Sequence, residues 1–237
     1  VGGGVRANGT ITAHGYRTTR RYNEELMSLF ESEAEAAERG DVADNLDSGS
    51  ALLIAGSVTD GVFISSTGTL QAYTGGGAAF EISPDEDADS DQVIGEVFLP
   101  DDYTSNRTDD DEDGDQLGYA VVNEGTIANS GVFDGKDATA FLIVGRDDNG
   151  VLRSVILGAD GILNTNNIQA IAYDGTATAV RLGAGVQAES FSNTGIVAAT
   201  ATLGHDEDGF ADDLHGTGMA IALDLDGSGT TDIKTGL

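Results

Sequence analysis

The chain has 237 residues, and its 41 Asp and Glu against 11 Lys and Arg give a formal net charge of −30 at pH 7. Such a negative surface repels nucleic acid and anionic membranes, and it suits divalent cations or a salty medium. The absence of cysteine excludes disulfides and thiol chemistry, and no apolar run approaches the ~18 residues of a transmembrane helix. The 34 glycines and only two prolines, with Val, Ile and Thr frequent, indicate an all-β chain with many tight turns.

The first part of the chain predicts a pair of strands and then a helix. Over residues 22–39 the apolar side chains follow a helical spacing, with Asn23 placed as the N-cap and Gly40 as the stop. We therefore expect one inserted α-helix within residues 17–48. In the simpler interpretation this helix covers an edge of the fold, and in the other it binds a partner.

Two short patterns then alternate along the chain. In the first, turn-forming residues precede an aliphatic residue, which in the five copies is Ile11, Leu70, Ile127, Ile168 and Val197. In the second, an alanine opens a run of alternating aliphatic residues, and in the five copies this alanine is Ala51, Ala79, Ala140, Ala179 and Ala220. Five copies of each pattern exceed the three or so repeats that a solenoid needs.

The spacing of the first pattern distinguishes between types of solenoid. Its aliphatic residues lie 59, 57, 41 and 29 residues apart, whereas an α-solenoid needs a nearly constant period. A parallel β-helix keeps its coils stacked while it tolerates insertions at the corners. We therefore predict one parallel β-helix over residues 1–237, with the shortest spacing close to one bare coil. Two acidic insertions are expected at its corners, over residues 84–116 and 204–216.

Both ends of the chain have repeat-like sequence without the polar cap that a solenoid requires. Exposed coil ends would offer unpaired backbone groups to another strand. We therefore expect neighbouring copies, or further coils of a longer precursor, to cover the two ends.

Two stretches carry the oxygen side chains and the glycine of a calcium-binding loop. The expected ligands are Asp109, Asp111 and Asp113 in the first stretch, and Asp224, Asp226, Ser228 and Asp232 in the second. Both lack the bidentate Glu at loop position 12, where Ala120 and Thr235 stand, so neither is a complete EF-hand. Calcium would need a further ligand or water, and a solvated run of charge is the alternative interpretation.

Signatures of catalysis are sparse. The chain lacks the serine-hydrolase elbow, the zinc-protease helix motif and the phosphate-binding loop, and its three histidines, His14, His205 and His215, lie far apart. Carboxylates are so numerous that no two of them stand out in the sequence as a catalytic acid and base. We therefore expect a protein without enzymatic activity, and keep a polysaccharide-processing β-helix enzyme with an acidic groove as the alternative.

The recurring Asn-x-Gly-x-Ile pattern, the stretches 174–185 and 191–196, and the acidic insertions resemble the passenger region of bacterial autotransporters. The resemblance covers most of residues 50–237. It implies a right-handed parallel β-helix that is exported and displayed outside the cell, on the bacterial surface. It also implies a structural or adhesive function, with a surface glycan or a protein as the ligand.

Overall fold

The computed structural model of the chain describes residues 3–14, 49–73, 76–99, 115–134, 136–148, 151–173, 175–202, 218–225 and 232–233. Over these ranges the chain forms strands, turns and loops and no helix, so the described protein is all-β. The helix expected within residues 17–48 and the insertion expected at 204–216 lie outside these ranges. Within the same ranges there is no helix long and apolar enough to cross a membrane.

Most strands stack in parallel into four sheets, which we name I to IV in the order in which the chain visits them. Sheet I contains β1 (Val5–Ala7), β4 (Val62–Ile64), β10 (Val121–Asn123), β16 (Gly161–Asn164) and β20 (Ser190–Asn193). Sheet II contains β2 (Thr10–His14), β5 (Thr69–Tyr73), β11 (Thr126–Asp134), β17 (Asn167–Tyr173) and β21 (Ile196–Thr202). Sheet III contains β3 (Leu52–Ile54), β6 (Ala78–Ile82), β12 (Ala138–Ile143), β18 (Thr176–Leu182) and β22 (Met219–Leu225). Sheet IV contains β7 (Gln92–Ile94), β15 (Val155–Leu157), β19 (Val186–Ala188) and β23 (Asp232–Ile233).

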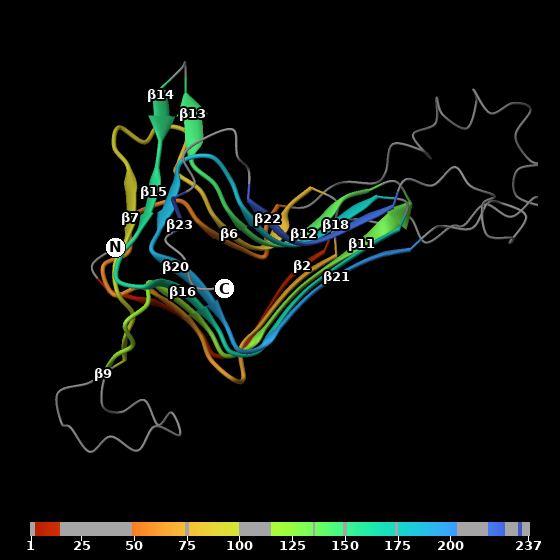
Figure 1. Cartoon of the computed structure of the whole chain (residues 1–237), viewed down its shortest axis with the longest axis horizontal. Helices are drawn as coiled ribbons and strands as arrows, with labels where there is room; N and C mark the ends of the chain where they lie inside the picture. The colour runs from red at the N-terminus through yellow and green to blue at the C-terminus, as the bar shows by residue number, and fades with distance from the viewer. Residues whose placement is uncertain are drawn as a thin grey trace, which may run out of the picture.

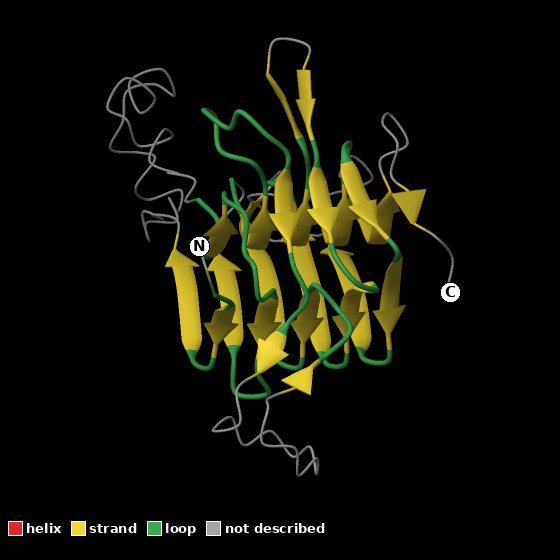
Figure 2. Ribbon diagram, turned by 90° about the vertical axis from the view of Figure 1, so that its left-hand side faces the viewer, coloured by secondary structure: helices red, strands yellow, loops and turns green. Residues whose placement is uncertain are grey.

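The chain visits sheets I, II, III and IV in turn and then returns to sheet I one strand further along, which makes five coils. Figure 1 looks along the stack, so the strands of each sheet lie behind one another, and Figure 2 shows them side by side. In the first coil, a parallel bridge between Val58 and Ile94 takes the place of a strand in sheet IV. Such stacking of parallel coils is consistent with a β-solenoid-like fold.

The ladder of sheet II confirms the alignment that the first sequence pattern predicts. In register along the stack lie Ile11, Leu70, Ile127, Ile168 and Val197. The shortest spacing, 29 residues, also separates the side chains of Asn164 and Asn193, which meet between successive coils. It is therefore the length of one coil without an insertion, as expected.

Sheet III follows the second sequence pattern with one difference. In the first four copies, the residue that follows the alanine of the pattern lies in register with its counterparts along the stack. These residues are Leu52, Phe80, Phe141 and Val180. In the last coil Val180 pairs with Leu223, two residues beyond the position that the repeat predicts. Because side chains alternate along a strand with a period of two, this shift keeps the same face inward.

Inward side chains form one continuous core along the stack. Leu70, Ile127 and Ile168 are fully buried, and each such side chain contributes ~1.5–3 kcal/mol to stability. Phe80 and Phe141 pack on each other with ring centroids 4.8 Å apart. Buried alanines complete this core, which joins sheets II and III where they converge in Figure 1.

The acidic segment 84–116, expected as an insertion, contributes a strand to the stack. β7 lies in sheet IV, and its Ile94 is fully buried. The buried side-chain amide of Gln92 donates hydrogen bonds of 2.9 Å to the carbonyl oxygens of Ile54 and Gly56 in the preceding coil. Residues 92–94 therefore belong to the second coil.

Two antiparallel hairpins leave the stack. They pair β8 (Phe98–Leu99) with β9 (Asp115–Gln116), and β13 (Arg146–Asp148) with β14 (Val151–Arg153). The segment at β8 covers the outer face of sheet I, where Val97 and Leu99 form a second buried cluster with Phe63 and Val122. The hairpin of β13 and β14 projects from the stack, as both views show (Figures 1 and 2).

Candidate functional site

The positions expected to bind calcium are only partly described. Asp224 lies on β22 in sheet III, and Asp232 lies on β23 in sheet IV. The expected ligands outside the described ranges are Asp109, Asp111, Asp113, Asp226 and Ser228. The described residues include no group of three or more His, Asp or Glu that could hold a metal ion.

Asp224 already has a cationic neighbour. Its Oδ2 atom lies 3.6 Å from Nε of Arg181 on the adjacent strand, and both side chains are partly exposed. An exposed ion pair of this kind contributes at most about 1 kcal/mol, so a bound cation could displace the guanidinium. Calcium binding at this end of the chain stays a prediction.

A ladder of asparagines follows the turn between sheets I and II. Nδ2 of Asn123 donates to Oδ1 of Asn164, and Nδ2 of Asn164 donates to Oδ1 of Asn193, both at 2.7 Å. Asn123 and Asn164 are fully buried, and Oδ1 of Asn123 also accepts a 3.1 Å bond from the backbone N–H of Gly125. A Cβ atom at Gly125 would overlap the carbonyl oxygen of Gly68 in the preceding coil, so this turn requires glycine. These residues bind successive turns together and have a structural role.

The sequence indicates these asparagines as turn formers without indicating that they bond to one another. Their spacings of 41 and 29 residues equal those of the aliphatic ladder, and this equality is the signal that could have predicted the contact.

The outer face of sheet II carries no Asp, Glu, Lys or Arg over three successive outward positions of each strand. These positions take alternate residues, beginning at Thr10, Thr69, Thr126, Asn167 and Ile196. Their side chains are Thr, Gln, Asn, Ser, Tyr, Ile, Ala and one His, although 22% of the chain is charged. All of them are half-buried or exposed. These positions therefore form an accessible, uncharged and mainly polar surface.

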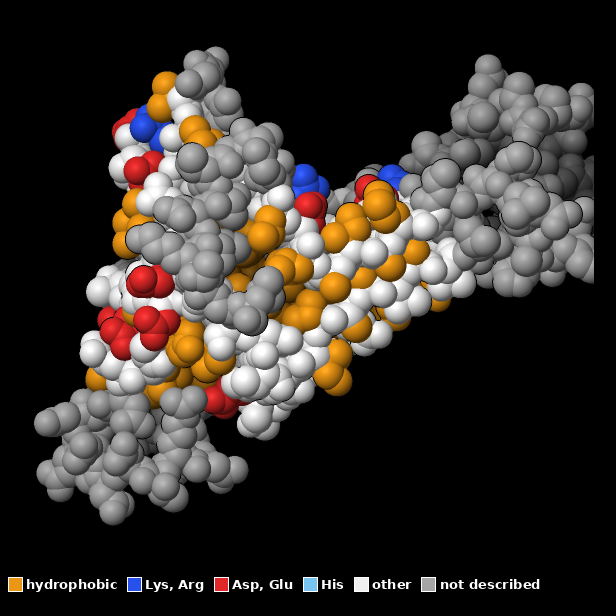
Figure 3. Space-filling view, in the orientation of Figure 1, with side chains coloured by type: hydrophobic (Ala, Val, Ile, Leu, Met, Phe, Trp, Pro, Cys, Tyr) orange, Lys and Arg blue, Asp and Glu red, His pale blue; other side chains and the backbone are white. Residues whose placement is uncertain are grey.

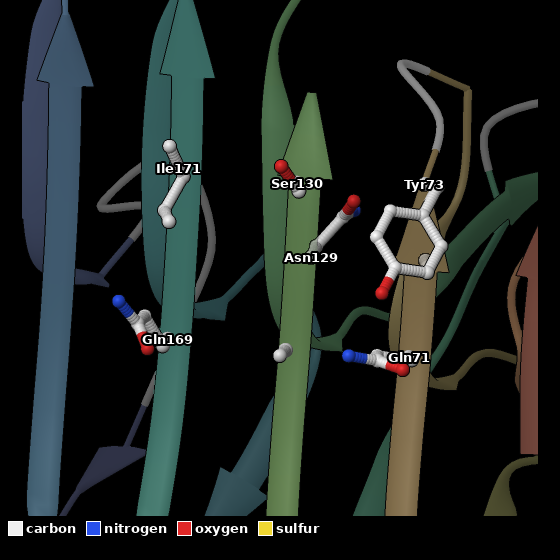
Figure 4. Close-up of a pocket in the computed structure, with 8 residues that line it drawn as sticks. Gln71, Tyr73, Asn129, Ser130, Gln169 and Ile171 are labelled. Atoms are coloured by element: carbon white, nitrogen blue, oxygen red, sulfur yellow. The ribbon is translucent and has the colours of Figure 1, made fainter. Parts of the chain in front are cut away.

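A shallow hollow of about 180 Å³ lies on this face (Figure 4). Small side chains on the middle strand, β11, stand between longer ones on β5 and β17. The side chains around the hollow are Gln71, Tyr73, Ala128, Ser130, Gln169 and Ile171. In register, Gln71 lies beside Ala128 and Ala128 beside Gln169, so the two glutamines stand two strand spacings apart. Figure 4 shows the amide of Gln71 directed toward β11 and the amide of Gln169 directed away from it.

The aromatic ring of Tyr73 is held in place at the edge of the hollow. It stacks on the ring of His14 with centroids 5.2 Å apart and planes inclined by 4°. Figure 4 shows its hydroxyl directed toward the hollow. The stacking restricts the rotation of the ring, so the hollow has one pre-oriented aromatic side chain.

The other outer faces differ from that of sheet II. Sheet III carries Glu81, Arg181 and Asp224 on the side away from the core. The outer positions of sheet I include Phe63 and Val122, which the segment at β8 covers. The described surface thus has a charged side, a covered apolar side and a neutral polar side.

Among the residues that the structure describes, none closes the core at either end of the stack. Leu225 in the last coil is 46% exposed, whereas its partner in the preceding coil, Leu182, is fully buried. In the first coil Ile11 is 37% exposed, and its partner Leu70 is fully buried. Figure 3 looks onto the last coil and shows a band of hydrophobic side chains across it. Another coil placed on either end would bury these side chains.

The chain matches no family model, no curated protein and no solved structure. The resemblance to autotransporter passengers therefore rests on sequence patterns alone. The stacked coils and the chemistry of their surfaces carry the functional argument that follows.

Proposed function

We propose that this protein is a non-enzymatic extracellular β-solenoid that acts as a rigid structural or adhesive shaft, as in the passenger regions that its sequence resembles. The observation that carries the proposal is the core ladder of sheet II, which runs in register through all five coils. Neighbouring strands in such a stack are hydrogen-bonded along their length at a spacing of ~4.8 Å. Bending or stretching the stack would break many of these bonds together, so the points at which the insertions leave the stack are fixed relative to one another.

The proposed shaft is right-handed and is displayed on a bacterial surface, as the resemblance implies. A net charge of −30 supports a location in which salt or divalent cations screen the repulsion within and between copies. An experimental density map that follows the chain from sheet I to sheet II and sheet III tests the handedness. A left-handed path would contradict it.

The absence of cysteine makes the rigidity directly testable with site-specific spin labels. Thr12→Cys and Ala198→Cys place two labels on the outer face of sheet II, in the first and last coils. Their strands are four spacings apart, or ~19 Å. Double electron–electron resonance on the rapidly frozen native protein should give a narrow distance distribution. A broad distribution in the native protein would contradict a rigid shaft.

We also propose that neighbouring copies or further coils cover the open ends. In β21 the N–H of Ile196 donates to the carbonyl oxygen of Asn166 at 2.7 Å, so the next N–H, that of Val197, points away from β17. Among the described strands β21 is the last of sheet II, so its outer edge can accept another parallel strand, and the core beneath it supplies apolar surface.

Sedimentation velocity over a range of concentrations tests whether the occupant is another copy. We expect end-to-end assembly that increases with salt, because each copy carries a charge of −30. Val197→Pro removes the outward N–H and places a ring on this edge, where proline is tolerated, so it should block assembly. Because the Val197 side chain also packs against the core, the melting temperature should fall as well, and assembly is compared at a temperature at which both proteins are folded. A parent protein that stays monomeric throughout would exclude copies of the chain and leave further coils as the covering.

A further inference from the structure

We propose that the outer face of sheet II binds a neutral polysaccharide, with one sugar ring seated in the hollow between Gln71 and Gln169. This inference deepens the adhesive function proposed above and rests on it. It assigns the ligand a chemical class and a place on the shaft.

The lack of charge on this face, together with the negative charge of the whole chain, favours an uncharged ligand. The three outward positions of each strand carry no formal charge, so an ionic polymer lying on them would have no counter-charge to pair with. An anionic polymer would also meet the repulsive field of a chain with a net charge of −30. An uncharged polymer incurs neither cost, because it binds through hydrogen bonds and stacking, which this face supplies.

The side chains around the hollow match the groups of a sugar ring. Each side-chain amide of Gln71 and Gln169 offers one acceptor oxygen and two N–H donors, and a sugar hydroxyl can both donate and accept. The two glutamines stand two strand spacings apart, or ~10 Å, with only Ala128 between them. This gap admits one ring: the amide of Gln71 is already directed into it (Figure 4), and the amide of Gln169 reaches the ring by a change of rotamer.

The pre-oriented ring of Tyr73 adds a surface for stacking. The face of an aromatic ring carries negative charge density and attracts the C–H groups on the face of a sugar. Because Tyr73 is already stacked on His14, little rotational freedom is lost when a ligand binds beside it. The strands beneath these side chains are fixed in the stack, so the backbone of the site is preformed.

A protein partner fits this face less well. The energetic centres of protein interfaces are rich in Trp, Tyr and Arg, and those interfaces are also enriched in Met. The three outward positions of each strand contain one tyrosine, Tyr73, and no Trp, Arg or Met, and the exposed Tyr173 lies one outward position further along β17. The remaining residues are short hydroxyl and amide side chains with scattered alanine and isoleucine, which form a flat polar surface.

Affinity electrophoresis in native gels tests the proposal, because this acidic protein migrates well without detergent. Separate gels contain dextran, galactomannan, laminarin or hydroxyethylcellulose as neutral polymers, and alginate or polygalacturonate as anionic ones. We expect at least one neutral polymer to retard the protein and neither anionic polymer to do so.

Variants then locate the site on the retarding polymer. Gln71→Ala combined with Gln169→Ala should weaken the apparent Kd about tenfold, since it removes hydrogen bonds from both sides of the ring. Tyr73→Ala should weaken it by a similar factor. The matched control is Gln187→Ala, which removes an exposed glutamine from sheet IV and should leave Kd unchanged. Melting curves check that all variants are folded, which we expect because the three glutamines point away from the core.

Three results would overturn the proposal. In the first, none of the four neutral polymers retards the protein. In the second, only the anionic polymers retard it. In the third, the retarding polymer retards the parent protein and the double glutamine variant equally. The spin-label distances report on the shaft independently. Rigid coils without binding would refute only the glycan site, whereas a disordered stack would refute the proposed shaft itself.

Discussion

Ile168 tests the core ladder at the scale of a single residue. It is fully buried and lies in register between Ile127 and Val197. Ile168→Asp would place an unpaired charge between coils and should lower the free energy of unfolding by ~4 kcal/mol or more, whereas Ile168→Val should cost ~0.5–1.5 kcal/mol. Urea unfolding measures both.

The neighbouring outward residue supplies the control for this prediction. Gln169→Asp introduces the same charge on the other side of the same strand, where water reaches it, and should change stability by no more than ~0.5 kcal/mol. If Ile168→Asp and Gln169→Asp had equal effects, the register of sheet II would be wrong at this coil.

Asn164 is the middle member of the asparagine ladder and bonds to both of its neighbours. Asn164→Ala leaves Nδ2 of Asn123 and Oδ1 of Asn193 without their partners, and each loss costs ~1–3 kcal/mol where the group is buried. We expect the free energy of unfolding to fall by ~2–4 kcal/mol. Asn166→Ala, in the same turn, removes an exposed bond to the carbonyl oxygen of Glu124 and should cost under ~1 kcal/mol. Similar losses in the two variants would argue against a stabilising ladder.

At the scale of elements, sheets II and III could be predicted from the sequence and sheet IV could not. The strands of sheets II and III are long enough to repeat a recognisable pattern of turn and aliphatic residues. The strands of sheet IV have two or three residues each and no residue type common to all four, so they are held by their neighbours rather than by a local signal. β7 is further obscured because acidic residues flank it on both sides.

The neutral hollow was also beyond the reach of sequence reasoning. It arises because Ala128 lies beside Gln71 and Gln169, which come from three different coils. No local sequence motif predicts a contact between residues of three coils. The lack of charge on this face is also not visible in any single stretch of the sequence, because the face is made of residues from all five coils. Only the register of the stack brings these side chains together.

The segment at β8 offers a prediction for a whole element. Leu99→Ser removes a buried side chain from the cluster that holds this segment on sheet I, so the segment should open without unfolding the shaft. Hydrogen exchange should speed up at Leu117, whose N–H bonds to the carbonyl oxygen of Val97, while the amides of β11 and β17 stay protected. Val151→Ser, at a half-exposed position on the other hairpin, should leave exchange unchanged. Faster exchange in β11 would mean that the segment supports the shaft itself.

For the whole molecule, the distribution of charge sets the conditions for association. A net charge of −30 opposes every contact between copies. Charges are sparse, however, on the described outer face of sheet II, and apolar side chains are exposed at the two ends of the stack. Salt shortens the range of the repulsion to about 8 Å at physiological ionic strength, so these surfaces can meet partners in a salty medium. Divalent cations would relieve the same repulsion at much lower concentration if specific sites bind them.

Calcium is the divalent cation that the acidic loops predict. Binding to the native state stabilises it by RT ln(1 + [L]/Kd), and loops without the bidentate Glu should have Kd values of ~10⁻⁴–10⁻³ M. At millimolar calcium this amounts to ~0.4–1.4 kcal/mol per site, or a rise in melting temperature of ~1–5 °C for a chain of this size.

Melting curves in EDTA, in millimolar calcium and in sodium chloride of matched ionic strength separate specific binding from screening. We expect a rise that calcium produces and sodium does not. Asp226→Asn should abolish the part of the rise that comes from the second loop, and it leaves the pair between Asp224 and Arg181 intact. Arg181→Gln should increase the calcium effect, because it frees the Asp224 carboxylate from its cationic neighbour. An equal rise in sodium would mean that the 30 excess negative charges are only screened, and that neither loop holds the ion.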